Sequence, residues 1–157
     1  MTCEADLKTF PISKVIEATG VGRDALGAWI RRDLLIVSAA PAKGQARMFD
    51  RDDVIHIGMI HQLTQLDIAV PQAVAIAYRH QANLQNEPNA CSPLAAPLLV
   101  ATSDDSGAYG VRAALFPRSS SYLEMRVGVG AAPCDAILIL DLDPLISKID
   151  AVLDGEE

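Results

Sequence analysis

The sequence predicts an α+β fold in two parts, a mainly helical N-terminal half followed by a small C-terminal α/β domain. Apolar residues recur at helical spacing up to about residue 82, whereas short apolar runs separated by Gly, Ser, Asp and Pro begin near residue 98. Three prolines fall in residues 83–97, which we expect to be a linker. Residues 1–80 carry nine basic and nine acidic side chains, so the whole net charge of −7 lies in the C-terminal half.

Composition indicates a folded protein, because 50% of the 157 residues are hydrophobic and 21% are charged. No apolar run has the roughly 18 residues of a membrane span, and the N-terminus lacks the basic and apolar segments of a secretory signal. We therefore expect a cytoplasmic protein with no membrane part. Cys3, Cys91 and Cys134 are widely separated, so we expect reduced thiols and neither a disulfide framework nor a zinc site.

The first two predicted helices are separated by a glycine turn. Ser13 is the expected N-cap of a short helix that ends at Thr19-Gly20, and Gly20-Val21-Gly22 forms the turn. The second helix covers residues 23–32. Its inner face carries Leu26, Trp29 and Ile30, and its other face carries charged and small residues, namely Arg23, Asp24, Gly27, Ala28 and Arg31.

A hairpin and two further helices complete the N-terminal half. Residues 38–49 contain an extended segment, a Pro/Gly loop and a second extended segment. The acidic residues of Asp50-Arg51-Asp52-Asp53 suit the N-terminus of an amphipathic, core-facing helix, and Pro71 opens another helix. Beyond the linker we expect strands at residues 98–101, 111–116, 125–129 and 136–142, followed by a helix over residues 145–153.

Helix, turn, helix, hairpin and helix follow in the order of a winged helix-turn-helix. The matching residues are Ile12-Ser13-Lys14-Val15, Thr19-Gly20-Val21-Gly22, Leu26-x-x-Trp29-Ile30-Arg31-Arg32-x-Leu34-Leu35, Arg47-Met48-Phe49 and Asp53-Val54. This half of the chain resembles the MerR superfamily and its relatives among phage excisionases and terminase small subunits. The expected domains are thus a DNA-binding domain at 10–82, the linker at 83–97 and a small acidic α/β domain at 98–157.

The resemblance implies that the second helix enters the major groove of double-stranded DNA. Arg23 and Asp24 would then reach base edges, and the small Ala28 would allow close approach. Phosphates would be held by Arg31, Arg32, Lys43 at the wing tip and Arg47. Trp29 would pack the helix against the wing, with its edge near DNA. Two positions depart from the family: Gly27 replaces an arginine that contacts DNA, and Asp33 replaces a glycine.

Simpler interpretations remain open for several of these residues. A single aromatic residue at helical spacing is more often part of a core than a contact, which applies to Trp29. Lys43-Gly44 could be an ordinary hairpin turn, and the arginines taken singly could be solvated helix charges. His56 and His61 are five residues apart, which is not the spacing of a metal pair. We expect no cofactor and no bound metal.

Enzymatic activity is not expected, because no phosphate loop, nucleophile motif or metal-binding motif is present. Asp141 and Asp143 flank the end of a predicted strand, where we expect them to cap the next helix. A thiol sensor built on Cys91 or Cys134 would lack the clustered ligands that such sensors need. Because the N-terminal half is electrically neutral, a monomer should bind DNA weakly, and we expect a homodimer. Prolines 88, 93 and 97 interrupt the long coil through which MerR regulators dimerise.

Our leading hypothesis is a sequence-specific transcriptional regulator, with a prophage or another mobile element as a candidate source. One alternative is an architectural DNA-binding protein of the excisionase or terminase type. Another is a protein-interaction adaptor that retains the winged fold, an interpretation favoured by the neutral charge and by Gly27. The acidic C-terminal half could dimerise, bind a small molecule or bind another protein, and nothing in its sequence selects one of these roles.

Overall fold

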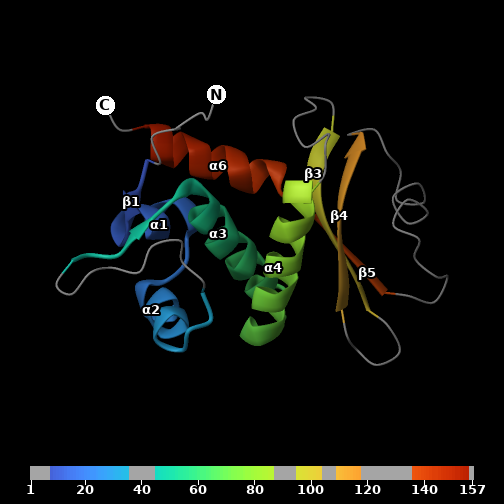
Figure 1. Cartoon of the computed structure of the whole chain (residues 1–157), viewed down its shortest axis with the longest axis horizontal. Coiled ribbons are helices and arrows are strands. Elements are labelled where there is room, and N and C mark those ends of the chain that lie inside the picture. The colour runs from blue at the N-terminus through green and yellow to red at the C-terminus, as the bar shows by residue number, and fades with distance from the viewer. Residues whose placement is uncertain (1–7, 36–44, 87–94, 104–108, 118–135, 156–157) are drawn as a thin grey trace. The chain divides into compact units, whose positions relative to one another are not determined.

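The computed structural model describes residues 8–35, 45–86, 95–103, 109–117 and 136–155 (Figure 1). The chain divides into two compact units. One consists of Met1–Ala73 together with Leu145–Glu157, and the other of Val74–Pro144. The C-terminal segment therefore returns to the unit that contains the N-terminus. Within the described part of the chain, no helix is both long enough and apolar enough to cross a membrane.

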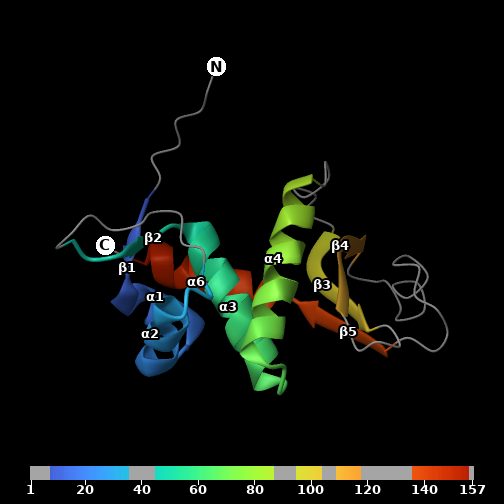
Figure 2. The same ribbon diagram turned by 60° about the horizontal axis from the view of Figure 1, so that its bottom comes forward.

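The first unit has the predicted order of elements. Helix α1 (Ile12–Thr19) is followed by α2 (Arg23–Arg31) and α3 (Arg51–Gln65), and Figure 2 gives a second view of the three. Strand β1 (Phe10–Pro11) pairs antiparallel with β2 (Met48–Phe49). Both phenylalanines of this strand pair are buried, so the pair is anchored in the core of the unit.

Two sequence predictions for this unit need correction. Ser13 is not the N-cap of α1, because the helix begins at Ile12 and Pro11 occupies the N-cap in an extended conformation without a side-chain hydrogen bond. Pro11 also pairs with Met48, so the strand leads directly into the helix. The described strand of the expected hairpin, β2, pairs with β1. The preceding half of that hairpin, including Lys43, lies outside the described residues.

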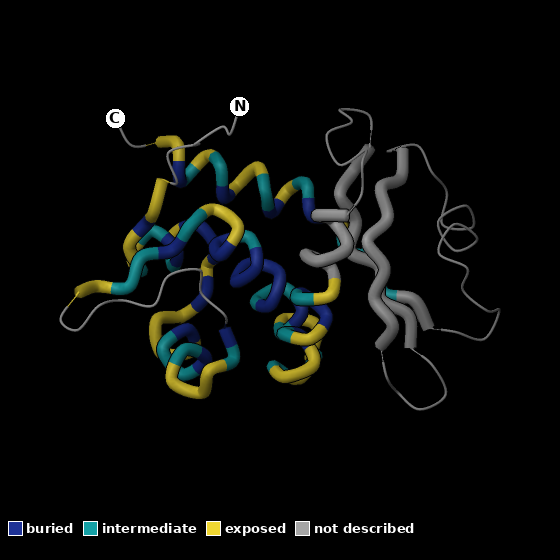
Figure 3. The backbone as a smooth tube through the Cα atoms, in the orientation of Figure 1, coloured by how far each residue is buried: buried dark blue, intermediate teal, exposed yellow. Residues whose placement is uncertain are grey.

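Helix α3 forms the centre of the unit. Its N-terminus is closed by a capping box, in which the Asp50 side chain accepts from Asp53 N–H at 2.8 Å and the Asp53 side chain accepts from Asp50 N–H at 3.1 Å. Helix α1 packs against α3. Buried residues follow one another along α3 from Asp53 to Leu63 on more than one face, as Figure 3 shows. A helix buried in this way needs packing partners on two sides.

The final helix, α6 (Asp143–Asp154), provides the second partner of α3. Its buried residues are Leu145, Ile149 and Leu153. Sequence reasoning had grouped this helix with the strands of residues 98–157, whereas residues 145–157 lie in the compact unit of the N-terminal helices. The physical reason lies in α3, where Gly58 has no side chain and leaves room for the side chains of Leu145 and Ile149.

The second unit contains most of α4 (Val70–Asn86) and a three-stranded antiparallel sheet. The strand order is β4-β3-β5, with β3 (Ala95–Ser103) between β4 (Tyr109–Pro117) and β5 (Ala136–Asp141). Three of the four predicted strands are thus found, two with wider bounds and the last ending one residue earlier, at Asp141, while residues 125–129 lie outside the described residues. Helix α4 extends to Asn86 and β3 begins at Ala95, so the expected linker is shorter than residues 83–97.

Candidate nucleic-acid interface

Helix α2 has an apolar face buried in the unit and a charged face exposed to solvent. Leu26 is fully buried and Trp29 is 7% exposed, so the indole ring belongs to the core. The four charged residues that the prediction places on this helix, Arg23, Asp24, Arg31 and Arg32, are exposed, and Ala28 is half-buried among them. The structure thus brings five of the eight predicted contact residues together on this helix with side chains accessible to solvent.

The turn before α2 is fixed by hydrogen bonds and by the burial of Val21. Gly20 has a φ of +78°, a conformation that glycine adopts without steric cost, and its N–H donates to the Ile16 carbonyl at 2.9 Å. The Thr19 hydroxyl donates to the Val15 carbonyl at 2.7 Å and accepts from Val21 N–H at 3.3 Å. Together these contacts define where α2 begins.

The end of α2 is equally well defined. Leu34 N–H donates to the Trp29 carbonyl at 3.0 Å and Asp33 N–H donates to the Ile30 carbonyl at 3.1 Å, which is the Schellman pattern. Asp33 takes the left-handed position of this motif, with a φ of +51°. A glycine, which the family has at this position, adopts this left-handed conformation without steric cost. The aspartate found here leaves the geometry of the turn intact.

The position of Arg31 bears on the departure at Gly27. A Cβ atom built on Gly27 would lie 3.4 Å from Nη1 of Arg31, so the guanidinium lies beside the glycine, one helical turn from its own backbone. This places a positive charge next to the position where the family has an arginine. The charge expected at Gly27 is therefore supplied in part by its neighbour.

Two of the predicted contacts, Lys43 and Arg47, belong to the expected wing, and Lys43 lies outside the described residues. Arg47 is half-buried and directly precedes β2, so the pairing of β2 with β1 fixes its backbone. Among the described residues, no carboxylate forms an ion pair with Arg23, Arg31, Arg32 or Arg47. By contrast, Lys14 contacts Glu17 at 3.4 Å and Arg51 contacts Asp150 at 2.7 Å. The basic groups of α2 and Arg47 are thus available to a polyanion.

The structure also bears on the prediction for Asp141 and Asp143. The Asp141 side chain accepts from Asp143 N–H at 3.0 Å at the start of α6, which confirms a capping role for Asp141, while Asp143 is the first residue of the helix. Within the described residues, no three His, Cys, Asp or Glu side chains are grouped in a way that could hold a metal ion. Sequence reasoning missed the ion pair between Arg51 and Asp150, although Gly58 in the middle of an apolar helix was a signal that another helix packs closely there.

Comparison with known families agrees with this geometry. Residues 10–78 match the family described as MerR HTH family regulatory protein. The matched segment begins at β1 and ends within α4, so it contains the turn, α2 and the β1–β2 pair. No curated protein matches the chain.

Proposed function

We propose that this chain, whose residues 10–78 form a MerR-type helix-turn-helix domain, is a sequence-specific regulator that binds double-stranded DNA through α2 and the wing. The observation that carries the proposal is the exposed basic face of α2, held in place by Leu26 and Trp29 in the core. An exposed helix of this kind fits the major groove, where base edges are read, while basic side chains hold the phosphates.

Each residue has a distinct role in this proposal. Arg23 and Asp24, at the start of α2, face base edges, and the small side chain of Ala28 permits close approach of the backbone. Arg31 and Arg32, at the end of α2, bind phosphates, as do Arg47 and Lys43 in the wing. The burial of Trp29 supports a packing role for this residue, which positions α2 without contacting DNA.

A homodimer is part of the proposal. Residues 1–80 have no net charge, and a neutral domain binds DNA weakly because phosphate neutralisation supplies most non-specific affinity. Two copies would double the number of phosphate contacts on one duplex. The second unit could then dimerise or bind a protein or small molecule.

Chromatin immunoprecipitation with sequencing tests this function. Discrete peaks that share a motif are expected for the wild type and should disappear in the Arg31→Ala, Arg47→Ala double variant. Each lost phosphate contact should also reduce the slope of log affinity against log salt by about 0.9, measured by fluorescence anisotropy on the enriched sequence. Arg79→Ala, which removes a positive charge from α4 instead, is the matched control.

Other outcomes select other functions. Peaks at recombination or packaging sites, in place of promoters, would identify an architectural protein of the excisionase or terminase type. Absence of enrichment, or enrichment unaffected by the loss of both arginines, would contradict DNA binding by α2 and the wing. The protein-interaction adaptor would then be the better hypothesis, and the second unit would be the part to study.

A further inference from the structure

Helix α6 is attached to the DNA-binding unit by apolar contacts with α3. Leu145, Ile149 and Leu153 recur at intervals of four residues and are all buried. A Cβ atom built on Gly58 of α3 would lie 3.0 Å from Cδ1 of Leu145 and 3.3 Å from Cδ1 of Ile149. The side chains of α6 therefore approach the backbone of α3 directly. Because the two helices are closely packed, a small movement of α6 would displace α3.

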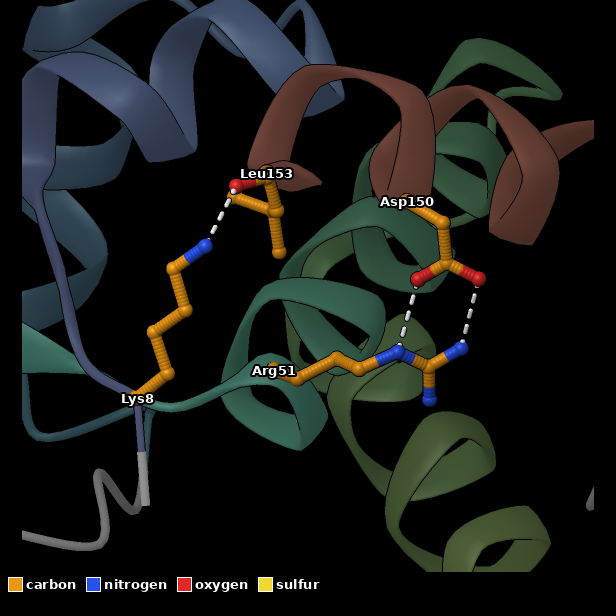
Figure 4. A network of polar contacts seen from close by, with 4 residues as sticks. All are labelled: Lys8, Arg51, Asp150 and Leu153. Atoms are coloured by element: carbon orange, nitrogen blue, oxygen red, sulfur yellow. Dashed lines mark hydrogen bonds and ion pairs between the residues drawn. The ribbon is translucent and has the colours of Figure 1, made fainter. Parts of the chain in front are cut away.

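Polar contacts connect α6 to Lys8 and Arg51, the two ends of the segment that contains α2 and the proposed wing. Asp150 accepts two hydrogen bonds from Arg51, at 2.7 Å from Nε and 2.8 Å from Nη2, and the Leu153 carbonyl accepts from Nζ of Lys8 at 3.3 Å (Figure 4). The hydrogen bond with Asp150 is the largest reason that the pKa of Arg51 is raised. A third group of α6, the Lys148 ammonium, lies 3.8 Å from the Cβ position of Gly20.

The two contacts, and the approach of Lys148 to Gly20, involve segments that set the geometry of the proposed interface. Gly20 ends α1 and begins the turn that leads into α2. Arg51 is the first residue of α3 and follows β2 by one residue, at the root of the wing. Lys8 precedes β1, the strand with which β2 pairs. Helix α6 thus contacts the segments beside β1 and β2 through Lys8 and Arg51 and passes close to the turn before α2, from outside the residues matched to the family.

We propose that α6 is a brace that holds the turn before α2 and the root of the wing in the arrangement that binds DNA, and that Asp150 is a positioning residue acting through Arg51. This inference rests on the proposed function. Because α6 follows the second unit in the chain, the brace also gives that unit a covalent route to the DNA-binding elements.

The division of roles within α6 makes the brace testable. The Arg51 and Asp150 side chains are 50% and 34% exposed, and exposed ion pairs contribute little to stability. The apolar contacts therefore keep α6 attached, while the two-pronged hydrogen bond fixes its position along α3. Removing the carboxylate should loosen that position and leave the protein folded. A stabilising role alone would change the unfolding midpoint and leave DNA affinity unchanged at lower temperature.

The test uses the full chain and a DNA sequence enriched by the wild-type protein from a random duplex library. Affinity is measured by fluorescence anisotropy well below the unfolding midpoint, with folding checked by circular dichroism. Asp150→Ala should weaken binding about threefold to tenfold, although the loss of a negative charge alone would strengthen it. Asp154→Ala removes the same charge from the same helix, without a direct hydrogen bond to Arg51, and should bind at least as tightly as the wild type.

A charge exchange provides the second measurement. Arg51→Asp and Asp150→Arg should each weaken binding, and the double variant, which has the wild-type net charge, should recover most of the affinity. Tighter binding by Asp150→Ala would overturn the brace and show instead that Asp150 masks Arg51 from phosphates. Equal affinity of Asp150→Ala and the wild type would also overturn it. Failure of the wild type to enrich any sequence would overturn the proposed function, and the brace with it.

Discussion

At the scale of single residues, two aspartates occupy backbone positions that favour glycine. Asp33 has a φ of +51° after α2 and Asp67 has a φ of +60° after α3. Both lie in Schellman motifs, the second of which is closed by bonds from Ile68 N–H to the Leu63 carbonyl and from Asp67 N–H to the Thr64 carbonyl, each 3.2 Å long. The left-handed region is costly for a residue with a Cβ atom, although aspartate tolerates it better than most.

Substitution Asp33→Gly should raise the free energy of unfolding by about 0.5–1 kcal/mol, because relief of the strained φ outweighs the added entropy of the unfolded chain. It also removes a negative charge next to Arg32, so DNA affinity should rise. Asp67→Gly is the matched control and should stabilise to a similar extent without changing affinity. Urea unfolding and fluorescence anisotropy measure the two effects, and a loss of stability in both variants would contradict the argument.

The sequence identified the residues around α1 and α2 but not all of their conformations. The predicted end of α1 at Gly20 is confirmed, because a glycine after an apolar helical pattern is a strong local signal. The predicted N-cap at Ser13 is wrong, because Pro11 is held by its pairing with Met48, which is distant in sequence. The orientation of Arg31 beside Gly27 depends on a side-chain rotamer, which the sequence pattern does not contain.

At the scale of the elements, α3 shows how one glycine determines a helix contact. Glycine in the middle of a helix costs about 1 kcal/mol relative to alanine, and Gly58 is nevertheless central in α3. Burial of Leu145 and Ile149 against it contributes roughly 1.5–3 kcal/mol for each side chain, which more than offsets that cost. The sequence predicted an amphipathic α3, whereas its burial on more than one face reflects α6, a partner 78 or more residues away.

Substitution Gly58→Leu should lower the free energy of unfolding by about 2 kcal/mol, because its side chain would overlap Leu145 and Ile149 and push α6 away from α3. Gly27→Ala on α2 is the control. The nearest atom to its new Cβ is the end of the flexible Arg31 side chain at 3.4 Å, so a gain of about 0.5–1 kcal/mol in helix propensity is expected. Chemical denaturation of both variants tests the pair, and equal effects of the two would be inconsistent with close packing at Gly58.

At the scale of the whole molecule, the sequence revealed the order of the elements, and it missed the return of α6 to the first unit. Local patterns predict helices and strands because each depends on neighbouring residues. Which helix covers which face depends on contacts between residues 51–58 and 145–153, and periodicity alone says nothing about such pairings. The brace therefore became visible only in three dimensions, as did the burial of His56 within α3.

His56 makes the stability of the molecule dependent on pH. Its side chain is 5% exposed, and burial lowers its pKa from 6.5 to about 4. The unfolded chain therefore binds a proton at a higher pH than the folded chain does. The contribution of His56 to the free energy of unfolding is therefore fully present above a pH of about 6.5. It is lost progressively as the pH falls toward about 4. The pKa of His61 is also lowered, first by burial and then by the charge of Lys148, which adds a contribution of the same sign.

The free energy of unfolding should thus fall by about 1 kcal/mol between about pH 7.5 and about pH 5.5 through His56, and by about 3 kcal/mol once the pH is below 4 or so. The upper interval is the diagnostic one, because most carboxyl groups titrate below it. In His56→Leu the free energy of unfolding should change less steeply with pH over this interval. The remaining slope should have the same sign, owing to His61. Urea unfolding at both pH values gives the slopes of the two proteins. An unchanged slope in the variant would show that the acid sensitivity arises elsewhere. A reduced slope would identify the buried neutral imidazole of His56 as a main cause of acid unfolding of the first unit.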